Sequence, residues 1–185
     1  MALEHAIMVA LMERSGSGYE LARRFDKSIG YFWKATHQQI YRVLKRMDEA
    51  GWVQGEAVAQ DGRPDKTMYE VSAAGKAELA RWIAEPTDIS PFRNELALKL
   101  RGAEYGDRDA MCAEVQRHLD QHVERLEVLR LIEKRDFPAP DQLSGTALHQ
   151  YLVLRAGVRA DEGYVEWCGE ILDALQPRTE RPTDR

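Results

Sequence analysis

Residues 36–53 read THQQIYRVLKRMDEAGWV, and this stretch decides the fold of the first half of the chain. Thr36 is followed three residues later by Gln39, which is the spacing of a capping box at a helix N-terminus. Gly51 is the type of residue that ends a helix. Between these signals, apolar residues recur on one helical face, namely Ile40, Val43, Leu44 and Met47. The stretch therefore predicts an amphipathic helix whose opposite face is polar and basic.

The sequence on either side predicts three more helices and a hairpin. Upstream, a short run of Ser and Gly separates two helix-forming segments. Downstream, a polar turn with Gly and Pro at 60–66 separates two strand-like segments, and Ser72 can cap a last helix whose Leu79, Trp82 and Ile83 are expected to face inward. The expected elements are helices at 2–12 and 19–27, the helix after Thr36, strands at 52–59 and 67–71, and a helix at 73–84. Three helices, a two-stranded wing and a fourth helix indicate a winged helix-turn-helix domain.

The second half of the chain is predicted to be helical. Two prolines within residues 85–91 interrupt any helix, so a domain boundary is expected there. Helix-forming sequence follows at 92–103, 107–135 and 146–175. The expected organisation is a winged helix-turn-helix domain at 1–85, a linker at 86–91, a helical domain at 92–176 and a flexible tail at 177–185. The predicted fold class is therefore mainly α.

The two long helices of this half carry seam residues at steps of three and four, as in a coiled coil. The first seam is Cys112, Val115, Leu119, His122, Leu126 and Leu129; the second is Tyr151, Leu154, Val158, Asp161, Val165, Cys168, Leu172 and Leu175. A second copy of the chain would bury such a helix pair best, so we expect a homodimer. An unpaired polar group in a seam costs about 1–3 kcal/mol. His122 and Asp161 therefore face water, fix the pairing register or line a pocket, and the sequence leaves these alternatives open.

Charge is distributed unevenly along the chain. The net charge is −5, yet residues 1–85 hold as many basic as acidic side chains, so the excess acid lies in the second half. Residues 34–46 contain four basic side chains and no carboxylate. A local basic stripe of this kind can engage DNA phosphates even in an acidic protein.

Composition and motifs exclude several classes of protein. No apolar run approaches the ~18 residues that span a bilayer. The first residues show neither the basic stretch nor the cleavage pattern of a secretory leader, and the two cysteines form no paired motif, so we expect a cytoplasmic protein. There is no phosphate-binding loop, dinucleotide fingerprint, nucleophile elbow or paired-cysteine zinc pattern, so we expect neither an enzyme nor a bound cofactor. Glu114, His118 and His122 have a spacing that can hold a metal, but a solvated or seam-facing histidine pair is the favoured interpretation.

The helix at 36–53 and the wing supply the predicted contacts to double-stranded DNA. In a winged helix-turn-helix the third helix enters the major groove. Gln can pair with adenine and Arg with guanine, whereas Lys and Tyr reach phosphates. A charged wing tip suits phosphate or minor-groove contact. The predicted DNA-contacting residues are Thr36, His37, Gln38, Gln39, Tyr41, Arg42, Lys45, Arg63 and Lys66.

Two segments, QIYRVLKRMDEAGWV at 39–53 and GRPDKTMYEVSAAGKAEL at 62–79, resemble the PadR family of transcription regulators. The shared features are the Ile-Tyr pair, the Gly that ends the third helix, the Arg-Pro wing, the Tyr-x-x-Ser-x-x-Gly motif and the Gly-Tyr-Glu-Leu start of the second helix. The resemblance covers roughly residues 5–85. The C-terminal half is similar in pattern to the dimerisation domain of AphA-type virulence activators. One departure is Arg42, where many members have Pro, so the family's base preferences do not transfer.

The resemblance implies a homodimeric repressor that binds an inverted-repeat operator and is released by a small molecule, in several members a phenolic acid. The family's ligand region lies between its two domains. The matching positions here are His5, Met8, Tyr31, Trp33, Phe92 and Arg93. Ordinary core packing is the competing interpretation of these residues. The alternative function is a helical interaction module whose winged domain binds protein without ligand control.

Overall fold

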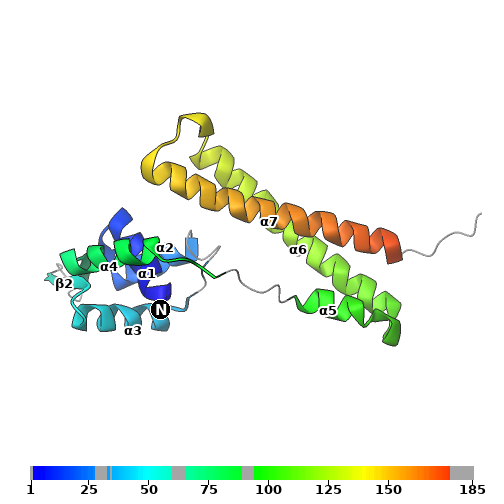
Figure 1. Cartoon of the computed structure of the whole chain (residues 1–185), viewed down its shortest axis with the longest axis horizontal. Helices are drawn as coiled ribbons and strands as arrows, with labels where there is room; N and C mark the ends of the chain where they lie inside the picture. The colour runs from blue at the N-terminus through cyan, green and yellow to red at the C-terminus, as the bar shows by residue number, and fades with distance from the viewer. Residues whose placement is uncertain (1, 28–32, 34, 60–65, 89–93, 176–185) are drawn as a thin grey trace, which may run out of the picture. The chain divides into compact units, whose positions relative to one another are not determined.

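The computed structural model describes residues 2–27, 33, 35–59, 66–88 and 94–175 (Figure 1). The chain divides into two compact units, Met1–Ile89 and Ser90–Arg185. The first is a winged unit, with helices packed beside a small sheet. The second is a helical unit dominated by two long antiparallel helices.

The winged unit contains the predicted helices and strands, with one addition. Its described elements are α1 (Ala2–Glu13), β1 (Gly16–Ser17), α2 (Gly18–Lys27), α3 (His37–Glu49), β2 (Val53–Val58), β3 (Lys66–Val71) and α4 (Ala73–Ala84). The sheet has three antiparallel strands in the order β1-β3-β2. In its register Ser17 lies opposite Met68, and Val53 lies opposite Val71. The predicted two-stranded wing is present as β2 and β3. The third strand, β1, was not predicted, because its two residues are too few to show an alternating pattern.

The core of the winged unit lies between the helices and the sheet. All four apolar residues predicted for the inner face of α3 are buried. They join Ile7 of α1, Leu21 and Phe25 of α2, and Leu79 of α4 in one cluster. Ile83, predicted to face inward, is instead 66% exposed. One cluster built from α1, α2, α3 and α4 fixes the orientation of α3.

The junction of α3, β2 and α4 is tightly packed. Gly51 ends the turn after α3 with a φ of 72°, a conformation that glycine adopts without a steric penalty. Ser72 caps α4 by accepting a hydrogen bond from the Gly75 backbone N–H at 3.0 Å, and its hydroxyl donates to the Gly51 carbonyl at 2.6 Å. A Cβ on Gly75 would lie 2.1 Å from the Trp52 carbonyl oxygen. Only glycine therefore fits where α4 approaches the start of β2.

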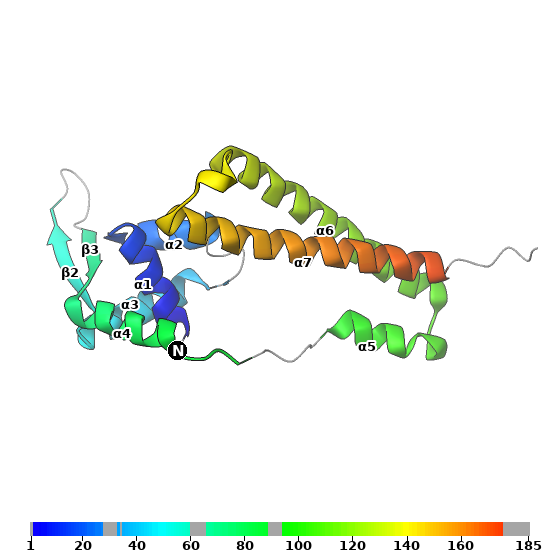
Figure 2. The same ribbon diagram turned by 45° about the horizontal axis from the view of Figure 1, so that its top comes forward.

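The helical unit is built on α6 (Arg108–Asp136) and α7 (Gly145–Leu175), which pack against each other and are inclined to one another (Figure 1 and Figure 2). The shorter elements are α5 (Glu95–Arg101), η2 (Ala103–Tyr105) and η3 (Pro140–Gln142). Asn94 caps α5, so this helix begins after the expected position 92. No helix in the described ranges combines the length and apolar character needed to cross a membrane.

The seam between α6 and α7 follows the predicted spacing in part. Val115, Leu126 and Leu129 of α6 are buried, as are Val158 and Cys168 of α7. Two other buried seam residues, Met111 and Ile171, were not predicted. The apolar contacts form two separate clusters: one contains Val115 and Cys168, and the other contains Leu126 and Val158. The buried apolar core between these helices is therefore discontinuous.

Candidate nucleic-acid interface

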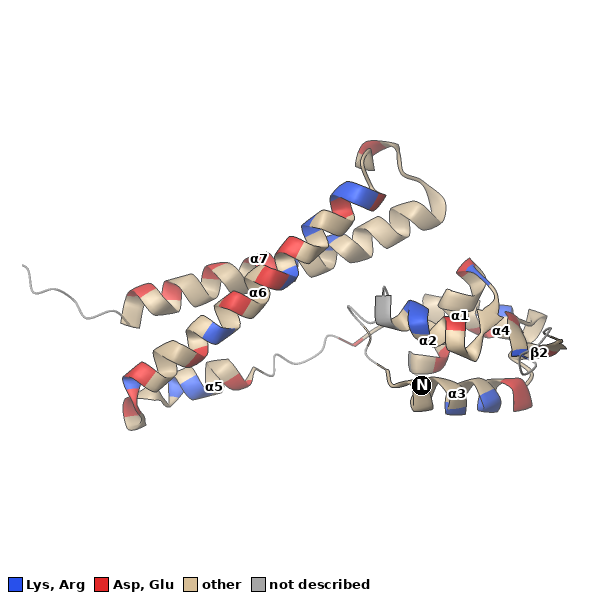
Figure 3. Ribbon diagram, turned by 180° about the vertical axis from the view of Figure 1, so that it is seen from behind, with Lys and Arg blue, Asp and Glu red and all other residues tan. Residues whose placement is uncertain are grey.

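The exposed face of α3 carries the polar and basic side chains that the sequence predicts for DNA contact. Tyr41, Arg42 and Lys45 are exposed, opposite the buried apolar face. Figure 3 shows basic residues along the outer side of α3 and acidic residues at its C-terminal end. Both features suit a helix that approaches a polyanion with its first three turns.

The cations of α3 differ in how they are engaged. Arg46 forms an ion pair with Glu4 of α1, whose side chain is only 10% exposed. Lys45 lies 3.9 Å from Glu49 in an exposed pair, which contributes little. Arg42 makes no ion pair or hydrogen bond with another residue that the structure describes. Arg42 and Lys45 are therefore available to an incoming phosphate or base, whereas Arg46 holds α3 against α1.

The N-terminus of α3 is fixed by the predicted capping box. The Thr36 hydroxyl accepts a hydrogen bond from the Gln39 backbone N–H at 3.2 Å, and the Gln39 side-chain oxygen accepts one from the Thr36 backbone N–H at 2.8 Å. Two of the predicted DNA contacts thus have structural duties in the free protein. His37 and Gln38, at the start of the helix, are exposed.

Tyr41 is held in place by the start of α2. A Cβ on Gly18 would lie 2.5 Å from the Tyr41 ring. The ring therefore rests against the Gly18 backbone, and about half of the tyrosine remains exposed. Gly18 is the first residue of the Gly-Tyr-Glu-Leu sequence, so its role here is to admit an aromatic side chain of α3.

The base of the wing is tied to α2 by an ion pair. Lys66, the first residue of β3, places its Nζ 3.3 Å from Oε1 of Glu20. The other oxygen of Glu20 accepts the Ser17 backbone N–H at 2.9 Å. This hydrogen bond, with a further contribution from Lys66, lowers the pKa of Glu20. Arg63, the other predicted wing contact, lies outside the described residues.

His5, a predicted ligand residue, lies in a buried aromatic cluster. Its ring stacks on Trp82 with a centroid distance of 4.4 Å, and its Nε2 lies 3.2 Å from Oε1 of Glu78. Hydrogen bonds from Arg81 and His5 lower the pKa of Glu78 to about 2. The cluster connects α1 to α4 within the winged unit.

The other predicted ligand residues are not brought together in the described part of the chain. Met8 is fully buried in the core of the winged unit. Trp33 is 39% exposed. Tyr31, Phe92 and Arg93 fall outside the described residues. The assignment of a ligand to these positions stays a prediction.

His122 and Asp161 contact each other across the seam. The His122 Nδ1 lies 2.7 Å from Oδ1 of Asp161, which is 2% exposed, and the Arg125 Nε lies 3.2 Å from the second carboxylate oxygen. Tyr164 stacks on His122 with a centroid distance of 4.3 Å, and its hydroxyl accepts a hydrogen bond from Asn94. Asp161 is thus buried and paired and does not face water, whereas register fixing and pocket lining stay predictions.

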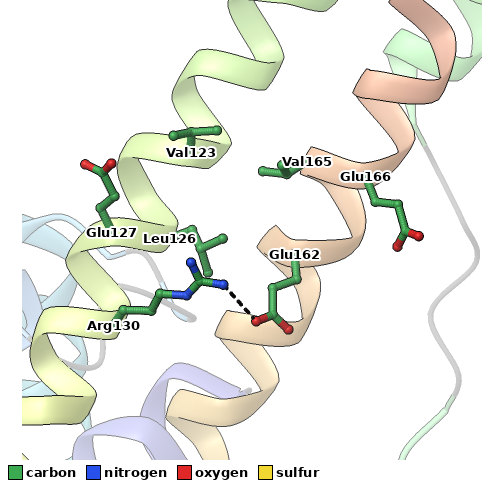
Figure 4. Close-up of a pocket in the computed structure, with 7 residues that line it drawn as sticks. All are labelled: Val123, Leu126, Glu127, Arg130, Glu162, Val165 and Glu166. Carbon is green, nitrogen blue, oxygen red and sulfur yellow. Dashed lines mark hydrogen bonds and ion pairs between the residues drawn. The ribbon is translucent and has the colours of Figure 1, made fainter. Parts of the chain in front are cut away.

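A groove of about 330 Å³ lies on the helical unit between α6 and α7 (Figure 4). Its apolar surface comes from Val123, Leu126 and Val165. Arg130 reaches across the groove to Glu162 at 3.2 Å. Because Glu127, Glu162 and Glu166 outnumber the single guanidinium, the local field disfavours an anionic ligand here.

Sequence reasoning missed two residues that organise this interface, Glu4 and Glu20. The signal for Glu20 was present, because Ser17 and Glu20 have the spacing of a capping box, and both of its hydrogen bonds form. The pairing of Glu4 with Arg46 spans 42 residues, and no local pattern reveals such a contact.

Two protein families match this chain. The transcriptional regulator PadR-like family matches residues 7–81, and the virulence activator alpha C-terminal family matches residues 92–176. The probable transcriptional regulator Rv1176c of Mycobacterium tuberculosis is 53% identical, over 96% of this chain and 100% of the relative. The negative transcriptional regulator PadR of Bacillus subtilis is 28% identical, over 92% of this chain and 95% of the relative.

Solved structures are similar to this chain over more than nine-tenths of its length. Bacillus subtilis PadR in complex with operator DNA has a TM-score of 0.85 at 26% identity, covering 95% of this chain and all of the other. The same regulator in complex with p-coumaric acid has a TM-score of 0.78 at 26% identity, covering 94% of each chain. The Vibrio cholerae virulence activator AphA has a TM-score of 0.77 at 27% identity, covering 94% of this chain and 97% of the other.

Proposed function

Because this chain belongs to the PadR-like family of DNA-binding transcriptional regulators, we propose that it is a homodimeric repressor that a small ligand releases from an inverted-repeat operator. The observation that carries the DNA-binding part is α3, which is buried on one face and offers Tyr41, Arg42 and Lys45 on the other. Its relatives are transcriptional regulators rather than enzymes.

We assign DNA binding to residues 1–85 and dimerisation to residues 92–176, joined by a linker at 86–91. The α6–α7 pair leaves apolar side chains such as Leu131 and Leu152 more than half exposed, which favours burial against a second copy. In a symmetric dimer the two α3 helices would sit about 34–36 Å apart, the spacing of one DNA turn. This geometry matches two half-sites on one face of the duplex.

The ligand is proposed from the relative that binds p-coumaric acid and from the positions that the family resemblance indicates. A ligand can release DNA only to the extent that it binds more tightly to the dimer whose two winged units are wrongly spaced for the operator. A hundredfold loss of operator affinity needs about 2.7 kcal/mol of such coupling, which lies within the usual allosteric range. The acidic groove between α6 and α7 is a poor candidate for an anionic phenolic acid.

The test is fluorescence anisotropy on DNA from upstream of the protein's own gene. We expect salt-sensitive binding that Arg42→Ala and Lys45→Ala each weaken at least fivefold while the dimer persists in sedimentation. Arg159→Ala, which removes an exposed cation from α7, is the matched control and should bind normally. Normal binding by both α3 variants would refute the placement of α3 in the groove.

The same assay tests the ligand and the competing function. Release of DNA by one compound from a panel of phenolic acids would identify the effector class. Binding that no compound disturbs would remove the ligand from the proposal. A failure to bind this DNA and random duplex at low salt would instead favour the protein-interaction module.

A further inference from the structure

The pair formed by Glu20 and Lys66 joins two parts of the winged unit that are far apart in sequence. Glu20 lies in the first turn of α2, and Lys66 begins β3 where the chain returns from the wing. β1, which immediately precedes α2, pairs with β3. The carboxylate and the ammonium therefore meet at the point where the sheet meets the helix-turn-helix.

The two members of this pair are held with very different rigidity. Glu20 is fixed by the capping box, because its carboxylate accepts the Ser17 N–H and its own N–H reaches the Ser17 hydroxyl at 3.3 Å. Oε2 of Glu20 is also lodged beside Gly16, where a Cβ would lie 3.2 Å away. Lys66 contributes a flexible four-carbon chain with a mobile head. The lysine is thus the partner that can leave.

The pair is also exposed enough for an exchange of partners. The Lys66 side chain is 33% exposed and the Glu20 side chain is 46% exposed. Ion pairs in such surroundings contribute little to stability. A DNA phosphate that accepts Lys66 also releases condensed counterions, a gain that the carboxylate does not provide.

We infer that Glu20 competes with DNA for Lys66: its carboxylate holds Lys66 at the base of the wing in the free protein, and Lys66 moves to a DNA phosphate when the wing docks. The inference rests on the proposed function, because it requires the wing to approach DNA. Glu20 does not contact the DNA; its carboxylate competes with DNA phosphates for Lys66. Its charge therefore lowers the affinity of the wing for phosphate.

Four proteins test the exchange in salt titrations of DNA binding: wild type, Glu20→Gln, Lys66→Met and the double variant. Glutamine preserves the capping box while removing the charge. Glu56→Gln is the matched control, since Glu56 is exposed on β2 and forms no ion pair with another described residue. Thermal unfolding checks that each variant is folded.

The exchange predicts a distinct pattern. Lys66→Met should reduce the slope of log affinity against log salt by about 0.9, the loss of one phosphate contact. Glu20→Gln should keep the wild-type slope and raise affinity about two- to fivefold at low salt, more than Glu56→Gln does. In the Lys66→Met background the same change should have less than a twofold effect.

A Glu20–Lys66 pair that stays intact in the DNA complex predicts the opposite results. If Lys66 stays on Glu20 in the complex, Glu20→Gln should loosen the wing and weaken binding, and Lys66→Met should leave the slope unchanged. Either result overturns the inference. Wild-type protein without salt-sensitive DNA binding would overturn the proposed function itself, and the inference with it.

Discussion

The winged unit and the helical unit of this chain bury their apolar residues in different ways. The winged unit gathers residues from α1, α2, α3 and α4 into one cluster. The helical unit has two smaller clusters along α6 and α7, and the polar Asp161 is buried in the same seam. A layer of helices around a shared core excludes water by itself, whereas a pair of helices leaves flanks exposed. The comparison shows why one unit can present a fixed surface and why the other suits association with a second copy.

The same glycine substitution should have opposite effects in the two units. Gly75→Ala places a Cβ 2.1 Å from the Trp52 carbonyl oxygen, so backbone must move, and we expect a loss of about 3 kcal/mol in the free energy of unfolding. Gly163→Ala, in α7, meets no atom within 4 Å and should gain about 0.5–1 kcal/mol because alanine favours helix.

Urea denaturation with hydrogen exchange to separate the units measures both changes. A Gly75→Ala protein as stable as wild type would mean that the α4 junction yields easily, contrary to the close packing described. A strongly destabilised Gly163→Ala protein would mean that another chain covers this side of α7.

Loss of the contact between His122 and Asp161 should have the next largest effect on the free energy of unfolding. His122→Leu removes the 2.7 Å partner of Asp161 and leaves a buried carboxylate with Arg125 as its remaining partner among the ion pairs described. We expect a loss of about 2 kcal/mol in unfolding free energy. The double variant with Asp161→Leu removes the buried charge as well and should return to within about 1 kcal/mol of wild type. A double variant less stable than His122→Leu alone would show that Asp161 contributes without His122.

Acid should act on carboxylates of both units with small effects, and the two whose pKa values are lowered most are Glu78 and Glu114. The pKa of Glu78 is lowered to about 2 chiefly by the Arg81 hydrogen bond, and that of Glu114 to about 2 chiefly by the Arg117 hydrogen bond. A carboxylate with a lowered pKa stabilises the fold above its unfolded pKa near 4.5 and loses that contribution as pH falls toward 2.

Glu78→Gln and Glu114→Gln should therefore differ from wild type at pH 6 and converge with it as pH approaches 2. Thermal melts over this range, with hydrogen exchange to assign each unit, give the measurement. A difference that persists unchanged at pH 2 would assign the effect to the shape of the side chain and not to its charge.

Local patterns predicted α3 well, and long-range contacts account for what they missed. The capping box, the apolar spacing and Gly51 are all encoded within a few turns, so the helix and its four buried residues were correct. β1 has two residues, too few for a period, and is defined only by pairing with β3. Ile83 was wrongly placed because α4 buries a narrower stripe, centred on Leu79, than its composition suggests.

The predicted DNA interface shows the same difference between what local patterns reveal and what long-range contacts decide. Periodicity separated the exposed face of α3 from its buried face. It could not show that Arg46 is held by Glu4, or Lys66 by Glu20, because these pairs join residues more than 40 positions apart. The number of cations in the predicted interface is therefore a poor measure of how many are available to DNA.

The contact between His122 and Asp161 also has a mechanical consequence for α6 and α7. A displacement of one helix along the other by a single turn, about 5.4 Å, would carry the carboxylate away from its imidazole and leave it among apolar side chains. Sliding along the axis is thus opposed by a steep electrostatic cost. Rotation or splaying about this contact keeps the two side chains together. Relative motion of α6 and α7 should accordingly be a change of crossing angle about the His122–Asp161 contact and not a translation along the helix axes.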